Sequence, residues 1–146
     1  MSAETVKEKP KWPYLHPIPV HFPLALFPAA FASLLVYLLT GRPEFEAGAH
    51  VMSIIGLLVT PVTIATGFAD WKIRYRGQMT RIFRIKIIGA LSLLALALPV
   101  VLMRLQHPEM NLLPLDWTGW LYLGLLGACQ IDCMIIGYYG GRLVFH

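Results

Sequence analysis

Four long runs of apolar residues, separated by charged segments, dominate the pattern of this chain. They cover residues 22–39, 49–69, 87–103 and 117–138. A helix rises about 1.5 Å per residue, so about 20 apolar residues cross a hydrocarbon core of about 30 Å. The runs lack the alternation of barrel strands, which are the other backbone structure that lipid tolerates. The pattern therefore predicts an all-α membrane protein, a four-helix transmembrane bundle that forms a single domain over residues 1–146.

Composition supports this class. Hydrophobic residues make up 57% of the chain, charged residues 14%, and the mean hydropathy is +0.63. A soluble domain typically has about 25% charged residues. The lower charged fraction of this chain therefore favours a multi-pass membrane protein. The first 21 residues have no long apolar h-region, and we expect no removable signal peptide. The prolines between Lys9 and Val20 predict an extended segment before the first helix.

Lysine and arginine gather on one side of the predicted bundle. Of the 12 basic residues, all but Arg42 and Arg104 lie in the N-terminal segment, in the loop after the second run or in the tail. The positive-inside rule then predicts that both termini are cytoplasmic, an N-in/C-in topology. The net charge of +4 is therefore a topology signal that does not indicate nucleic acid as a partner. We expect the basic loop to lie against anionic lipid head groups.

Few polar side chains fall at or inside the predicted bilayer, and each is a candidate functional residue. They are His16, His21, His50, Asp70, His107, Asp132 and His146. The predicted topology places one group at the cytoplasmic end, and this group consists of His16, His21, Asp70 and His146. The pair His50 and His107 lies at the outer end. Asp132 falls in the inner half of the fourth run.

Two chemistries use imidazoles at such positions. Haem b in a helical bundle needs two axial histidines from different elements at one depth. The inner group offers His21 with His146 or His16, and the outer pair offers His50 with His107. A metal ion needs three or four converging N or O ligands, and His16, His21 and Asp70, with His146, are the candidates. The opposing interpretation is that all of them are interfacial side chains bonded to carbonyls and head groups.

Two further features of the fourth run have two interpretations each. Asp132 fits a hydrogen-bonded contact between helices as well as a proton relay. Gly119, Gly124 and Gly127 form a stripe of small residues, which permits the close approach of another helix or admits a flat ligand.

Three segments carry a resemblance to a known family. They are His-Pro-Ile-Pro-Val-His-Phe-Pro at 16–23, Thr-Gly-Phe-Ala-Asp-Trp at 66–71 and Gly-Gly-Arg-Leu-Val-Phe-His at 140–146. With these segments the chain resembles a family of predicted four-helix bacterial integral membrane proteins, a domain of unknown function. The resemblance implies occurrence alone or beside Rieske or cytochrome redox modules, and location in the bacterial inner membrane. The residues that it carries over by position are His16, His21, Gly67, Asp70 and His146.

Two hypotheses follow. In the first, the chain is a small subunit of a respiratory or photosynthetic electron-transfer complex that binds haem b or quinone. In the second, it is a cofactor-free structural membrane subunit of a larger complex. Both predict the lipid bilayer and other membrane or redox subunits as partners. A transporter fits less well, because the sequence has no pair of broken helices and no polar site at the midplane.

Overall fold

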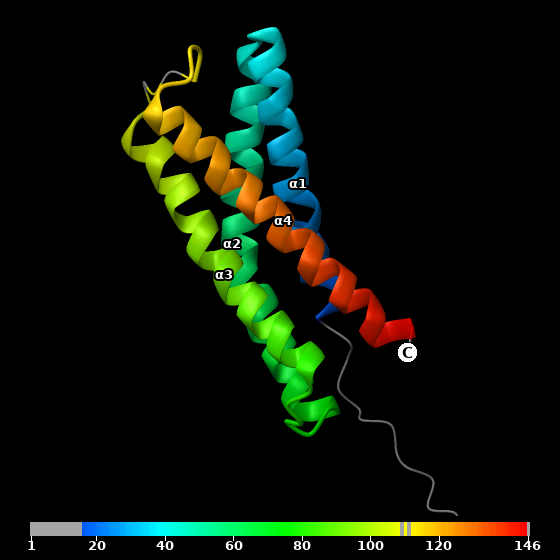
Figure 1. The fold of residues 1–146 in the computed structure, drawn as a ribbon. Coiled ribbons are helices and arrows are strands. Elements are labelled where there is room, and N and C mark those ends of the chain that lie inside the picture. Colours follow the sequence, from blue (N-terminus) through cyan, green and yellow to red (C-terminus); the bar gives the residue numbers. More distant parts are fainter. Residues whose placement is uncertain (1–15, 109, 111, 146) are drawn as a thin grey trace, which may run out of the picture.

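The protein is a bundle of four long helices. The computed structural model describes residues 16–145 apart from 109 and 111, and it contains α1 (Pro17–Thr40), α2 (Pro43–Arg74), α3 (Arg81–Gln106) and α4 (Trp117–Phe145) (Figure 1). Each helix is long and apolar enough to cross a membrane. The predicted all-α fold with four spans is thereby confirmed.

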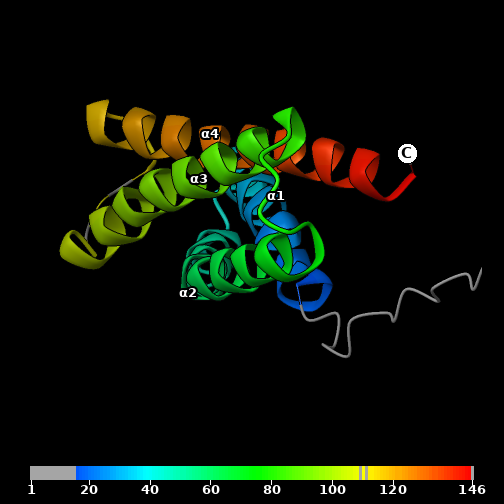
Figure 2. The ribbon, with the colours of Figure 1, turned by 90° about the horizontal axis from the view of Figure 1, so that it is seen from below.

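The helices follow one another around the bundle. Each packs against two neighbours: α1 against α2 and α4, and α3 likewise against α2 and α4. The start of α1, the α2–α3 loop and the end of α4 lie at one end of the bundle, which we call the inner end (Figure 1). The α1–α2 and α3–α4 connections lie at the other, outer end. Both views show the last turns of α4 leaning away from the other helices (Figures 1 and 2).

The first helix begins earlier than the prolines predicted. The expected extended segment is wrong for residues 17–20, because α1 begins at Pro17. Pro17 and Pro19 stand in its first turn, where backbone N–H groups have no intrahelical partner and a missing N–H therefore removes no bond. Pro23 and Pro28 lie further along the same helix.

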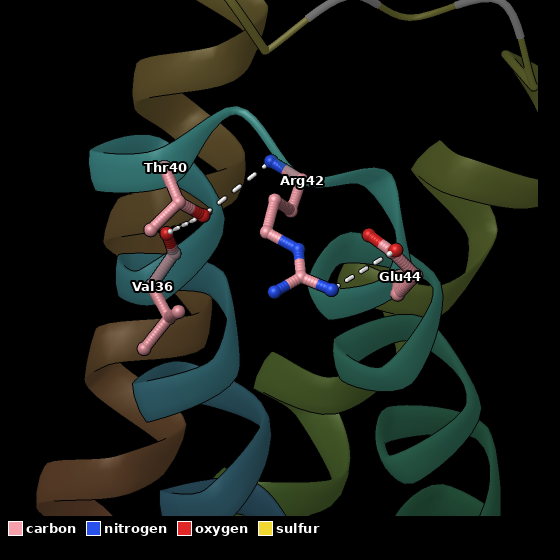
Figure 3. Close-up of polar contacts among 4 residues, drawn as sticks. All are labelled: Val36, Thr40, Arg42 and Glu44. Carbon is pink, nitrogen blue, oxygen red and sulfur yellow. Dashed lines mark hydrogen bonds and ion pairs between the residues drawn. The ribbon is translucent and has the colours of Figure 1, made fainter.

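A short polar turn joins α1 to α2 at the outer end (Figure 3). Gly41 adopts a left-handed conformation with φ 67°, and its N–H donates to the carbonyl of Tyr37 at 2.7 Å. The Thr40 hydroxyl donates to the carbonyl of Val36 at 2.7 Å. Arg42 and Glu44 form an ion pair at 3.4 Å, but both side chains are about two-thirds exposed. Such an exposed pair contributes little to stability. The shape of the turn therefore depends on Gly41 and on the two hydrogen bonds at the end of α1.

The buried positions of the helices recur about every seven residues, alternating steps of three and four. On α2 the buried positions are mostly small: Ala49, Ser53, Gly56, Thr60, Thr63 and Asp70. Small residues let helix backbones approach closely, and a Cβ built at Gly56 would lie 3.0 Å from the ring of Phe27 on α1. The buried hydroxyls donate within their own helix, for example Thr60 to the carbonyl of Gly56 at 2.7 Å. The spacing of three and four residues is that of left-handed helix packing.

The glycines of α4 do not form the single surface that the sequence predicted. A Cβ at Gly119 would lie 2.9 Å from Leu115, and one at Gly127 would lie 3.2 Å from the ring of Phe31 on α1. A Cβ at Gly124 would meet no other atom of the described chain within 4 Å. Gly119 therefore packs closely against the α3–α4 connection and Gly127 against α1, while Gly124 faces outward.

Candidate functional sites at the two ends of the bundle

His16 lies against α2 at the inner end. It occupies the position before the first turn of α1, and its Nδ1 lies 3.3 Å from the Thr66 hydroxyl. A Cβ built at Gly67 would be 2.9 Å from the imidazole Cε1, so glycine makes room for the ring. Burial lowers the pKa of His16 below 6.5 and the Lys86 ammonium lowers it further, while the Asp70 carboxylate opposes the shift.

Asp70 stands near side chains of three helices at this end. Its side chain is buried on α2 and forms an ion pair with Arg74 at 3.6 Å. The same carboxylate acts electrostatically on His16 at the start of α1 and on Lys86 of α3. The sequence led us to expect His16 and Asp70 at one depth, and the structure brings them together beside two cations. This arrangement fits a clamp between helices as well as part of a polar site.

His21, another member of the inner group, does not contact this clamp. His21 is exposed, and its Nδ1 donates to the carbonyl of Pro17 in its own helix. His146 lies outside the described residues. Among the residues that the structure describes, no three His, Cys, Asp or Glu side chains converge as metal ligands would. The pairing of His21 with His146 or His16 around haem b stays a prediction.

A second polar cluster lies at the outer end and was not predicted. Glu46 of α2 and Arg104 of α3 form an ion pair at 2.5 Å, and both side chains are less than one-fifth exposed. Arg104 also donates to the carbonyls of Pro108 at 2.8 Å and Met110 at 3.0 Å in the α3–α4 connection. Its guanidinium thus ties α2, α3 and the following loop together. The charges of this pair act electrostatically on Tyr122 of α4, which is 2% exposed.

His50 stands beside this ion pair. Its Nδ1 is buried and has no hydrogen-bond partner among the described residues. Arg104 and Glu46 both act electrostatically on the imidazole. A buried polar atom without a partner is costly to stability.

A cavity opens next to this imidazole. Its volume is about 410 Å³. The walls combine apolar side chains with the polar cluster: Pro43, Glu46, Ala47, His50, Arg104, Leu105 and Pro108. Ligand pockets commonly have such a largely apolar lining with a few polar groups.

His107 is at the same end but has a different environment. It is exposed, and it caps α3 with its N–H bonded to the carbonyl of Met103 at 3.0 Å. His107 is not among the residues that line the cavity, although Pro108 is. The predicted outer pair therefore shares one end of the bundle, and His50 alone of the two stands at the cavity.

Sequence reasoning missed Glu46 and Arg104 because each reads as an ordinary loop charge beside an apolar run. One signal was available: they are charges of opposite sign that border two different spans on the same predicted side. Charges at the ends of spans that pair across helices are expected where the helices meet.

Asp132 makes a contact between helices. The Ser92 hydroxyl of α3 donates to its Oδ2, and a Cβ at Gly89 would lie 3.3 Å from its Oδ1. This hydrogen bond joins α3 to α4, as one of the two sequence interpretations requires. No described contact extends the pair into a chain of proton carriers.

Comparison with known proteins identifies the family. No curated protein and no solved structure matched the chain. The family of predicted membrane proteins DUF2231 matches residues 13–146, a range that includes all four helices and both polar clusters. The chain belongs to this family of predicted membrane proteins.

Proposed function

We propose that this protein is a small integral subunit of a membrane electron-transfer complex, and that it binds the head group of a quinone at the outer end. The observation that carries the proposal is the cavity of about 410 Å³ with His50 in its wall. The family resemblance implies occurrence beside redox modules, and such an occurrence fits the same class of function. The position of the cavity at the outer ends of the candidate spans supports a ligand that enters from the surface of a bilayer, as a lipid-soluble quinone would.

The cavity offers what a quinone ring needs. Pro43, Ala47, Leu105 and Pro108 supply apolar contacts for a flat ring. A neutral imidazole carries one N–H donor and one bare nitrogen acceptor, so His50 can donate a hydrogen bond to a quinone carbonyl. The ion pair of Arg104 and Glu46 fixes the wall beside it, because each side chain is held by the other and Arg104 is also held by the loop. A prearranged wall reduces the cost of ordering on binding.

Haem b is the alternative redox ligand for this end. His50 and His107 come from α2 and from the end of α3, and haem needs axial ligands from two elements. The exposure of His107 makes this pair a poorer fit than the quinone. An absorption spectrum of the purified protein, oxidised and then reduced with dithionite, distinguishes the two ligands, because a Soret band and an α-band identify haem.

The experiment for the quinone is the quinone content of the protein after purification in mild detergent. Organic extraction followed by chromatography should yield bound quinone from the wild type and from His107→Leu. His50→Leu should yield much less. Equal quinone in His50→Leu and wild type, or none in either, contradicts the proposed site.

A cofactor-free structural subunit is the second candidate, and one observation favours it. A Cβ at Gly124, Gly137, Gly140 or Gly141 of α4 would meet nothing within 4 Å in the described part of the chain. Glycines that face outward from a membrane helix suit close contact with a helix of another subunit. Co-isolation of larger subunits that is lost in Gly124→Leu, together with a colourless and quinone-free wild type, would favour this function over the first.

A further inference from the structure

The α2–α3 loop at the inner end borders a second cavity, which is open to the surface. Its volume is about 210 Å³, and it is lined by Arg74, Tyr75, Arg76, Gln78, Thr80 and Phe83. The loop has a defined shape, because the Trp71 indole N–H donates to the Gln78 carbonyl and the Gln78 N–H donates to the Tyr75 carbonyl, both at 2.9 Å. Arg76 and Gly77 adopt left-handed conformations at φ 52° and φ 69°.

Basic residues predominate around this cavity, although Arg74 of its lining is paired with Asp70 at 3.6 Å. Residues 71–86 contain six lysines and arginines and no aspartate or glutamate. Arg76 is exposed, and among the described residues its guanidinium has no hydrogen bond and no ion pair. A left-handed conformation is unfavourable for arginine, and residues held in such conformations concentrate at functional sites.

The N-terminus of α3 borders the same cavity. The Thr80 hydroxyl accepts from the N–H of Phe83 at 3.4 Å, which marks Thr80 as the cap, and both residues line the cavity. The N–H groups of the first turn and the helix dipole favour an anion there. No acidic residue stands in this first turn to compensate for them.

One wall of the cavity is aromatic. The rings of Tyr75 and Phe83 meet edge to face with centroids 4.6 Å apart. Both residues lie at or next to the ends of candidate spans, where the apolar core of a bilayer would give way to water. The site thus combines cations and a helix terminus, which suit a phosphate, with an apolar surface, which suits the glycerol and first acyl carbons of a lipid.

We propose that this cavity binds the phosphate-bearing head group of an anionic phospholipid, with the Arg76 guanidinium as its principal cation. Basic pockets between membrane helices are known to hold such head groups. The site is independent of the outer-end cavity, because its lining belongs to the α2–α3 loop and that of the outer cavity to the start of α2 and the end of α3. These segments lie at opposite ends of the bundle (Figure 1). It also goes beyond general attraction of a basic loop to a charged surface, since it predicts a bound lipid that survives extraction.

The test compares two variants that remove one positive charge each. Arg76→Asn keeps a residue that tolerates the left-handed turn. Arg42→Asn is the matched control, because Arg42 is also exposed but lies in the outer-end turn. Detergent-solubilised protein is titrated with phosphatidylglycerol or with phosphatidylcholine of the same acyl chains, and bound lipid is counted by native mass spectrometry. A further arm adds inorganic phosphate alone in molar excess.

We expect phosphatidylglycerol to bind in preference to phosphatidylcholine. Arg76→Asn should weaken its affinity about fivefold and Arg42→Asn should leave it unchanged. Equal binding of the two lipids, or equal weakening by the two variants, would overturn the proposal. Displacement of phosphatidylglycerol by inorganic phosphate, with the same dependence on Arg76, would assign the site to a free anion and overturn the lipid assignment.

Discussion

The imidazole of His16 lies directly over the backbone of Gly67, so that a Cβ at position 67 would come within 2.9 Å of its Cε1. This contact joins the first turn of α1 to α2 and sets the Nδ1 of His16 3.3 Å from the Thr66 hydroxyl. A side chain at position 67 must displace the ring and weaken that contact.

Gly67→Ala should therefore destabilise the bundle. We expect a loss of about 1 kcal/mol or more, since overpacking typically costs about 1–3 kcal/mol and alanine regains part of this through its higher helix propensity. Gly124→Ala is the matched control, because open space surrounds Gly124. It should be neutral or stabilising. Unfolding by SDS titration, followed by circular dichroism, measures both. Equal stability of the two variants would contradict the role assigned to His16.

The stability of the protein should also fall in mild acid. Because burial and Lys86 lower the pKa of His16, the unfolded chain takes up a proton near pH 6.5 while the folded protein still holds a neutral ring. The unfolded state then binds more protons, so stability declines as the pH falls below about 6.5. His16→Asn cannot titrate and should show a smaller decline. An identical decline in both proteins would show that other groups cause it.

The outer-end ion pair should matter more than the exposed one. Arg104→Met leaves the Glu46 carboxylate unpaired in a poorly solvated environment, and it removes the hydrogen bonds to the Pro108 and Met110 carbonyls. We therefore expect the free energy of unfolding to fall by about 3–5 kcal/mol. Arg42→Met breaks the exposed pair with Glu44 and should cost less than about 1 kcal/mol. The double variant Arg104→Met/Glu46→Met should recover part of the loss. SDS unfolding tests all three, and similar losses for Arg104→Met and Arg42→Met would contradict this view.

The predicted orientation can be tested separately. The excess of basic residues at the inner end predicts that this end is cytoplasmic. A fluorescent reporter that folds only in the cytoplasm, fused after His146, should be bright, and an alkaline phosphatase fused there should be inactive. The opposite pair of results would reverse the side of both candidate sites.

The sequence was sufficient to predict the spans, but it predicted the polar contacts of the inner end and not those of the outer end. Length and hydropathy determine what can cross a bilayer, so the four helices were predictable. The ends of the helices were less predictable, because polar turns such as those around Glu44 and Lys72 extend a helix beyond its apolar run. His16 and Asp70 were expected together because both stand at one end of predicted spans. Glu46 and Arg104 were missed because their contact depends on how α2 and α3 are rotated, which hydropathy does not determine.

The inward face of α2 shows a signal that the sequence did contain. Ala49, Ser53, Gly56, Thr60 and Thr63 recur at intervals of three and four residues, and all are buried. In a membrane helix such small residues mark the face that packs against other helices. Extending the series places Gly67 and Asp70 on the same face, which is where His16 meets them.

The most direct measurement of the proposed function is a calorimetric titration of a short-chain quinone into the protein in lipid nanodiscs. Wild type and His107→Leu should bind saturably, and His50→Leu should bind about tenfold more weakly, the loss expected for one hydrogen bond. Because the Nδ1 of His50 is buried without a partner among the described residues, leucine should not lower the unfolding stability. Weaker binding with unchanged stability would support the outer-end quinone site. Unchanged affinity in His50→Leu, or no saturable binding by the wild type, would contradict it.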